Sequence, residues 1–165
     1  MKWHCPTCGI EHDDLPRCLG VGAPWQIMDI PETEFERRVQ LTSDICIVDG
    51  REFFIRGHIV IPIHGESDPL LLSVWSSLSR KSFDHMCSRW HDGDRDGDPP
   101  YFGWLSSHLP GYPDTRLLKL SVQSRRPGWV PIFTLEPTGH PLAVEQRNGI
   151  SPGRWHELAA FIVHP

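Results

Sequence analysis

Frequent glycine and proline residues limit how long any helix or strand of this chain can be. Of its 165 residues, 14 are Gly and 16 are Pro. Both concentrate in turns, because glycine adopts backbone conformations that other residues avoid and proline lacks a backbone donor. We therefore expect many short elements joined by defined turns. The length suits a single domain, residues 1–165, that can bury a core without disulfides.

Apolar runs between these turn signals predict an antiparallel sheet of about five strands. Asp49-Gly50 lies between two such runs, and this dipeptide tolerates the positive φ angles of a hairpin turn. Alternating apolar residues continue the second run beyond a bend at Gly57. A second hairpin is expected around residues 126–128. The expected strands cover residues 45–48, 53–63, 70–75, 117–122 and 130–135.

Helical spacing and capping residues predict three helices beside the sheet. Pro31 opens a helix that should end near Thr42, and Ser79 can cap a helix that runs to about Trp90. Pro152 opens the last helix. Because the strands cluster and the helices flank them, the expected fold class is α+β.

Residues 1–25 show no helical or strand period, and we expect them to form a zinc-knuckle-like loop packed on an α+β body of residues 26–165. Cysteine and histidine recur there with the spacing C-x2-C-x3-H-x5-C. Two thiolates separated by two residues can face one ion across a tight turn. Four such donors fill a tetrahedral zinc site and leave no position for water, which makes the zinc structural. The expected ligands are Cys5, Cys8, His12 and Cys18.

Other interpretations of these cysteines and histidines also fit the sequence. Cys5 and Cys8 could be free thiols or form a reversible disulfide, although a redox motif usually follows a strand and starts a helix. If Cys18 does not bind, the fourth position is open, and a residue from elsewhere in the fold could take it. Candidates for that position are His4, Cys46 and His140. With a metal bound, we expect the converging donors, rather than hydrophobic packing, to hold this segment in place.

The acidic segment 92–98 matches the first half of a calcium-binding loop. A bidentate Glu belongs at the twelfth position of such a loop, but Gly103 stands there and Pro99-Pro100 interrupts the second half. We therefore expect a solvated connector that binds no calcium.

The common catalytic motifs are absent from the sequence. Single residues that could take part in catalysis or ligand binding are therefore considered one by one. His140 and Glu145 could act as an acid/base group and its partner, but a turn cap is the simpler interpretation of His140. Arg56 could clamp the carboxylate of a ligand, but an ion pair with Asp44 or Asp49 is simpler. Four tryptophans are expected in the core or at its rim: Trp75, Trp90, Trp104 and Trp129.

Charge and cysteine content restrict location and partners. Lys and Arg number 16 against 21 Asp and Glu, which gives a net charge of −5 at pH 7. This balance argues against nucleic-acid and membrane-surface binding and suits a basic protein partner. No apolar stretch is long enough for a transmembrane helix, and the N-terminus lacks the apolar core of a signal peptide. Five Cys argue against a disulfide framework, so we expect a cytoplasmic protein.

Several short motifs occur in an order that resembles one bacterial family. They are Cys-x-x-Cys-Gly-x-x-His at 5–12, Asp-Ile-Cys at 44–46, Phe-Phe-Ile-Arg-Gly at 53–57, Val-Trp at 74–75, Tyr-Phe-Gly-Trp-Leu at 101–105 and His-Pro-Leu-Ala at 140–143. Over nearly its whole length the chain resembles the domain of unknown function 2199 family. The resemblance implies a stand-alone bacterial protein and groups Cys5, Cys8 and His12 as a unit. It does not extend to Cys18, and it implies no activity.

Two functions of different classes fit these features. The first is a non-enzymatic binding protein with a structural zinc site and an acidic, tryptophan-rich surface for a protein partner. The alternative is a zinc-dependent hydrolase, in which Cys5, Cys8 and His12 leave the fourth position to water. In that enzyme His140 or Glu145 would serve as the general base.

Overall fold

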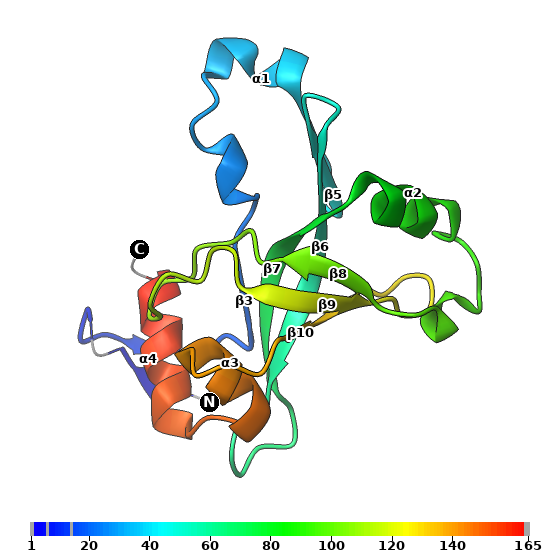
Figure 1. Ribbon diagram of the computed structural model, residues 1–165. Coiled ribbons are helices and arrows are strands. Elements are labelled where there is room, and N and C mark those ends of the chain that lie inside the picture. Colours follow the sequence, from blue (N-terminus) through cyan, green and yellow to red (C-terminus); the bar gives the residue numbers. More distant parts are fainter. Residues whose placement is uncertain (1, 6, 14, 164–165) are drawn as a thin grey trace.

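The computed structural model describes residues 2–5, 7–13 and 15–163, which form helices and two β-sheets (Figure 1). The strands are β1 Trp3–His4, β2 Glu11–His12, β3 Cys18–Gly20, β4 Val39–Leu41, β5 Ile45–Val48, β6 Glu52–Ile61, β7 Leu70–Leu78, β8 Tyr101–Trp104, β9 Lys119–Gln123 and β10 Ile132–Leu135. The helices are α1 Glu32–Arg38, α2 Arg80–Ser88, α3 Pro141–Asn148 and α4 Pro152–Val163, with 3-10 turns η1 Trp25–Ile27 and η2 Arg95–Gly97.

Strands β6 and β7 form the centre of the larger sheet. They pair antiparallel along their length, with Phe53 opposite Leu78 at one end and Ile61 opposite Leu70 at the other. The other edge of β6 is shared by β5, which pairs antiparallel with its first half, and by β10, which runs parallel to it. Beyond β10, strands β9 and β8 follow in antiparallel order. A bridge between Leu105 and Ser76 brings the end of β8 back to β7, so the sheet curls on itself.

The prediction of a five-stranded antiparallel sheet was wrong in size and in strand direction. The described residues form an eight-stranded sheet of mixed orientation and a two-stranded sheet of β1 and β2. Strand β3 runs parallel to β7, and β10 runs parallel to β6. Parallel neighbours are joined by long crossovers, and local periodicity carries no information on such distant pairing. The α+β class itself is confirmed by the mixture of helices and strands.

Capping and turn signals located several elements correctly. Asp49 and Gly50 adopt φ angles of 51° and 63° in the β5–β6 turn, as a hairpin of this type requires. The Ser79 hydroxyl accepts a hydrogen bond from the Ser82 N–H at the start of α2. Helix α4 begins at Pro152, as predicted.

Two helix predictions need correction. Helix α1 ends at Arg38 rather than near Thr42, because Val39 leaves the helix to pair with Val48 of β5. Burial of Val39 against the neighbouring strand outweighs its modest helix propensity. Helix α3 was not predicted, although Pro141 at its first position and Gly149 just past its end are typical helix boundaries.

Two hydrophobic cores use opposite faces of the β6–β7 ladder. Ile55, Ile59 and Ile61 of β6 join the main core, which also includes Trp155 of α4. Phe54 points the other way into a smaller core, because successive strand residues face opposite sides. Figure 1 shows α3 and α4 together on one side of the molecule and α1 at the far end of β5 and β6.

Strand β8 approaches β7 so closely at Gly103 that no side chain fits there. A Cβ atom on Gly103 would overlap the Ser76 hydroxyl and lie 2.5 Å from the Ser77 carbonyl oxygen. Glycine at this position is therefore a requirement of sheet closure.

Replacement of Gly103 by alanine tests this closure. We expect Gly103→Ala to lower the free energy of unfolding by about 1–3 kcal/mol, the usual effect of overpacking a filled site. Gly22→Ala is the control, because a Cβ atom at Gly22 would meet nothing within 4 Å. Urea unfolding followed by tryptophan fluorescence measures both variants. Equal stability of the two would contradict the close approach of β8 to β7.

Candidate metal centre

A short hairpin at the N-terminus brings three of the expected metal ligands together. Strands β1 and β2 pair antiparallel, and between them the Cys5 N–H donates to the Ile10 carbonyl at 3.0 Å. The Gly9 N–H donates to the Cys5 carbonyl at 2.9 Å, and Gly9 adopts a φ of 69° that closes the turn. The hairpin thereby directs Cys5, Cys8 and His12 to one place.

The three donors have a geometry that suits a tetrahedral metal ion. The ligand atoms of Cys5, Cys8 and His12 all lie within 4.8 Å of one another, and Cys8 Sγ is 3.4 Å from His12 Nε2. In a zinc site with metal–ligand bonds of about 2.0–2.3 Å, neighbouring donor atoms are roughly 3.3–3.8 Å apart. Only small movements separate the observed cluster from that arrangement. Two sulfurs and one imidazole nitrogen form a donor set for soft divalent metals.

The environment of Cys5 favours its thiolate form, which is the form that binds metal. Cys5 is only 1% exposed, and this burial by itself raises the pKa of its thiol. Hydrogen bonds from the backbone N–H groups of Cys8 and Thr7 oppose burial and lower the pKa below its ordinary value. The exposed Cys8 keeps one side of the cluster open to solvent.

Hydrophobic packing also holds the N-terminal segment, contrary to our expectation that metal donors alone would do so. Trp3 and Cys5 are both part of the main core. The Trp3 ring stacks on the His12 ring with centroids 5.2 Å apart. The indole N–H of Trp155 on α4 donates to the Pro16 carbonyl at 2.8 Å. The Trp3 ring also lies 5.9 Å, between centroids, from the His156 ring of α4, so an aromatic contact docks the hairpin on the body as well.

Cys18, the fourth expected ligand, is not brought to this cluster. It begins β3, where it is exposed and pairs with Leu71 of β7. Among the residues that the structure describes, the cluster consists of three donors. Of the alternative fourth ligands, Cys46 is buried in the smaller core, where burial and the nearby Glu52 raise the pKa of its thiol to about 11. His4 and His140 are likewise outside the group of three.

The two residues considered as a general base are engaged elsewhere. His140 Nδ1 accepts a hydrogen bond from the Leu142 N–H at 3.1 Å, and its Nε2 lies 3.2 Å from the Asp114 carbonyl. His140 thus caps α3, as the simpler interpretation predicted. Glu145 accepts hydrogen bonds from the Tyr112 hydroxyl at 2.5 Å and from Arg154 at 2.8 Å. Both side chains have structural partners.

The ion pair expected for Arg56 is present. Its Nη2 lies 3.3 Å from a carboxylate oxygen of Asp44, the first of the two expected partners. Asp49, the other expected partner, pairs instead with Arg38 at 2.8 Å.

The acidic segment between α2 and β8 is organised by an arginine. Arg89 contacts the carboxylates of Asp92, Asp94 and Asp98 at 2.9, 2.9 and 2.8 Å. Its hydrogen bonds lower the pKa of Asp98. The connector is therefore more ordered than the solvated loop that we expected, since these carboxylates surround a guanidinium group.

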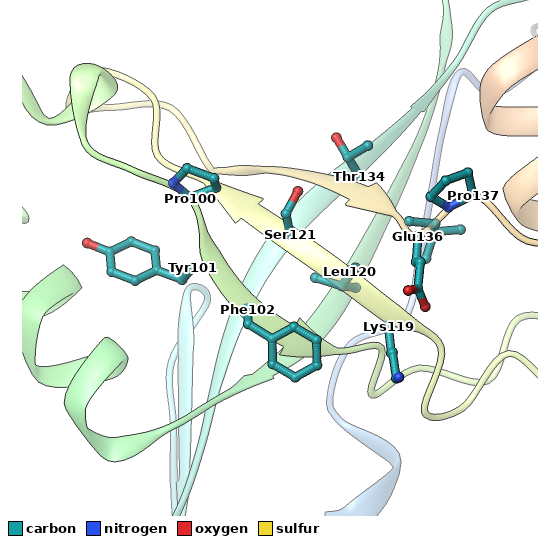
Figure 2. Close-up of a pocket in the computed structure, with 10 residues that line it drawn as sticks. Pro100, Tyr101, Phe102, Lys119, Leu120, Ser121, Thr134, Glu136 and Pro137 are labelled. Carbon is teal, nitrogen blue, oxygen red and sulfur yellow. The ribbon is translucent and has the colours of Figure 1, made fainter.

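A cavity lies apart from the cysteine cluster, against β8, β9 and β10 (Figure 2). Its volume is about 420 Å³. The Phe102 side chain borders it and is 55% exposed, and Trp104 lies beside Phe102 with ring centroids 5.3 Å apart. The lining residues are Pro100, Tyr101, Phe102, Lys119, Leu120, Ser121, Thr134, Leu135, Glu136 and Pro137. Sequence reasoning placed Trp104 at the core or its rim and did not identify this groove.

Among the described residues, no helix has the length and apolar character needed to cross a bilayer.

Comparison with known proteins identifies the family. The searches of curated proteins and of solved structures gave no match. A family model described as "Uncharacterized protein conserved in bacteria (DUF2199)" matches residues 4–150, a span that includes the three clustered donors. The resemblance seen in the sequence motifs is thereby confirmed, and the chain belongs to the DUF2199 family.

Proposed function

We propose that this protein is a non-enzymatic binding protein whose N-terminal hairpin is held by a structural zinc ion. The observation that carries the proposal is the convergence of Cys5, Cys8 and His12 at the junction of hairpin and body. Zinc, when bound, would cross-link the turn to β2 and add its binding free energy to folding. Cys5 belongs to the main core, so an ion on its sulfur would also fix the hairpin on the body.

The groove beside β8 is the surface proposed for a protein partner. Exposed aromatic side chains on rigid strands are typical of interface anchors. Phe102 and Trp104 form such a pair, and Lys119 Nζ lies 5.6 Å from the Trp104 ring centroid. Aromatic faces also attract cationic side chains. The exposed aromatic side chains and the net charge of −5 together favour a basic partner.

A zinc-dependent hydrolase remains the second candidate, because three protein donors leave one position for water. Its proposed general bases have no support, since His140 caps a helix and Glu145 pairs with Tyr112 and Arg154. The fourth position is thus open to water, but neither proposed base lies at the cluster, and for that reason we propose the structural role.

Metal content of cysteine variants tests the zinc site. We expect purified wild-type protein to hold about one zinc per chain. Cys8→Ser should lower the content severalfold, since removal of a thiolate weakens the site. Cys18→Ser and Cys87→Ser, which replace exposed cysteines outside the cluster, should keep wild-type content. Elemental analysis and the thiolate bands of the cobalt-substituted protein measure this outcome.

Two results would contradict this assignment. Equal metal content in Cys8→Ser and in the wild type would exclude a metal site at this cluster. Loss of metal in Cys18→Ser would show that Cys18 is a ligand.

The partner surface is tested by affinity capture from a lysate of cells that make the protein. We expect Phe102→Ala to reduce recovery of a basic partner at least about tenfold, since central aromatic anchors contribute roughly 2 kcal/mol or more to binding. Met28→Ala is the matched control, because Met28 is an exposed apolar side chain outside the groove. Recovery that is equal for both variants would exclude the groove as the docking surface.

A further inference from the structure

A second cluster of charged side chains lies where η2 meets the loop between β9 and β10. Arg95 at its centre is only 5% exposed. The guanidinium group of Arg95 donates to the carbonyls of Trp90 and Arg125 at 2.6 Å each, and to those of Arg126 and Trp129 at 3.4 and 3.3 Å. A buried positive charge is thus held by carbonyl dipoles rather than by a carboxylate.

Two further arginines of this cluster also lack a carboxylate partner. Within the described ranges, no ion pair joins Arg95, Arg125 or Arg126 to an acidic side chain. Arg125 donates through Nε to the Val130 carbonyl, which leaves its two Nη groups for other acceptors. Several other arginines of the chain are paired with carboxylates: Arg17, Arg38, Arg56, Arg89, Arg116 and Arg154.

The face of β6 beside this loop carries one further arginine, Arg56, and a histidine, His58. Arg56 and His58 are two residues apart and so project from the same face. Burial, followed by the charges of Arg125 and Arg56, lowers the pKa of His58. Burial likewise lowers the pKa of Arg125. A lowered pKa keeps the His58 imidazole neutral near pH 7, so the positive charge here comes from the arginines alone. Their charge would attract an anion.

Two cavities adjoin the cluster and share Trp129. One, of about 130 Å³, is lined by Arg56 and Arg95, and the other, of about 330 Å³, is lined by Arg125 and Arg126. The acidic side chains on the two linings are Asp44 and Asp96. Four guanidinium groups against these two carboxylates leave an excess of two positive charges, although the whole chain carries −5.

We propose that these cavities form a binding site for the phosphate group of a small molecule. A phosphate monoester carries about −1.5 to −2 charges near pH 7, which matches the local excess. Guanidinium groups present forked donors that suit phosphate oxygens. The Nη groups of Arg125 and the side chain of Arg126 are the direct donors. Arg95 adds positive charge at the neighbouring cavity, whereas the charge of Arg56 is balanced by Asp44.

Trp129 determines where the remainder of the ligand would lie. Its side chain is 53% exposed and lines both cavities, with the Arg125 guanidinium over its ring at 5.2 Å. The larger cavity is within the size range of small-ligand sites. A phosphorylated molecule would place its organic part against this indole.

Calorimetric titration of the full-length protein with inorganic phosphate, at constant ionic strength, tests the proposal. We expect saturable binding to the wild type and at least about tenfold weaker binding to Arg126→Gln, since a charged hydrogen bond is removed. Arg126 is exposed and its side chain makes no hydrogen bond to other described residues, so this change leaves the fold intact. Arg125→Gln should have a similar effect. Arg37→Gln on α1 is the control and should bind as the wild type does.

Further titrations distinguish the source of the phosphate. A nucleoside monophosphate that binds more tightly than inorganic phosphate, while its nucleoside does not bind, would identify esters as the ligands. Equal binding of both phosphates would identify free phosphate. Absence of saturable phosphate binding to the wild type, or wild-type affinity in Arg126→Gln, would overturn the proposal and leave Arg95 as a clamp between two loops.

Discussion

The antiparallel ladder between β6 and β7 supports every other part of the molecule. Its residues contribute to both hydrophobic cores, because odd and even positions of β6 face opposite sides. β7 also pairs with β3, and so anchors the segment that follows the cysteine hairpin. The residues of β6 that border the arginine cluster, Arg56 and His58, belong to the same strand.

The N-terminal hairpin combines two kinds of stabilisation. Backbone hydrogen bonds around Cys5 and Gly9 shape the turn, and Trp3 fixes the hairpin on the body through the main core and its contact with His156. The donor atoms of Cys5, Cys8 and His12 are thereby held close together by contacts that involve no ion. A preorganised site loses less conformational entropy when a metal binds.

Net charge conceals how the charges are distributed. The chain is acidic overall, yet Arg89 is surrounded by three aspartates, and carbonyl oxygens hold Arg95 a few residues later. Composition gives only the net charge of the whole chain. It cannot reveal a local excess of positive charge, because that excess arises where Arg56, Arg95 and Arg125 meet from three separate segments.

The sequence by itself determined the features that depend on a few neighbouring residues. These are the Asp49-Gly50 hairpin, the Ser79 cap and the spacing that brings Cys5, Cys8 and His12 together. Tertiary structure alone decided that β3 runs parallel to β7 and β10 parallel to β6, and that α1 ends before Val39. It also decided that Cys18 lies away from the metal cluster and that arginines from separate segments lie close together. Turn and cap chemistry acts over two to four residues, whereas pairing and burial depend on segments far apart in the chain.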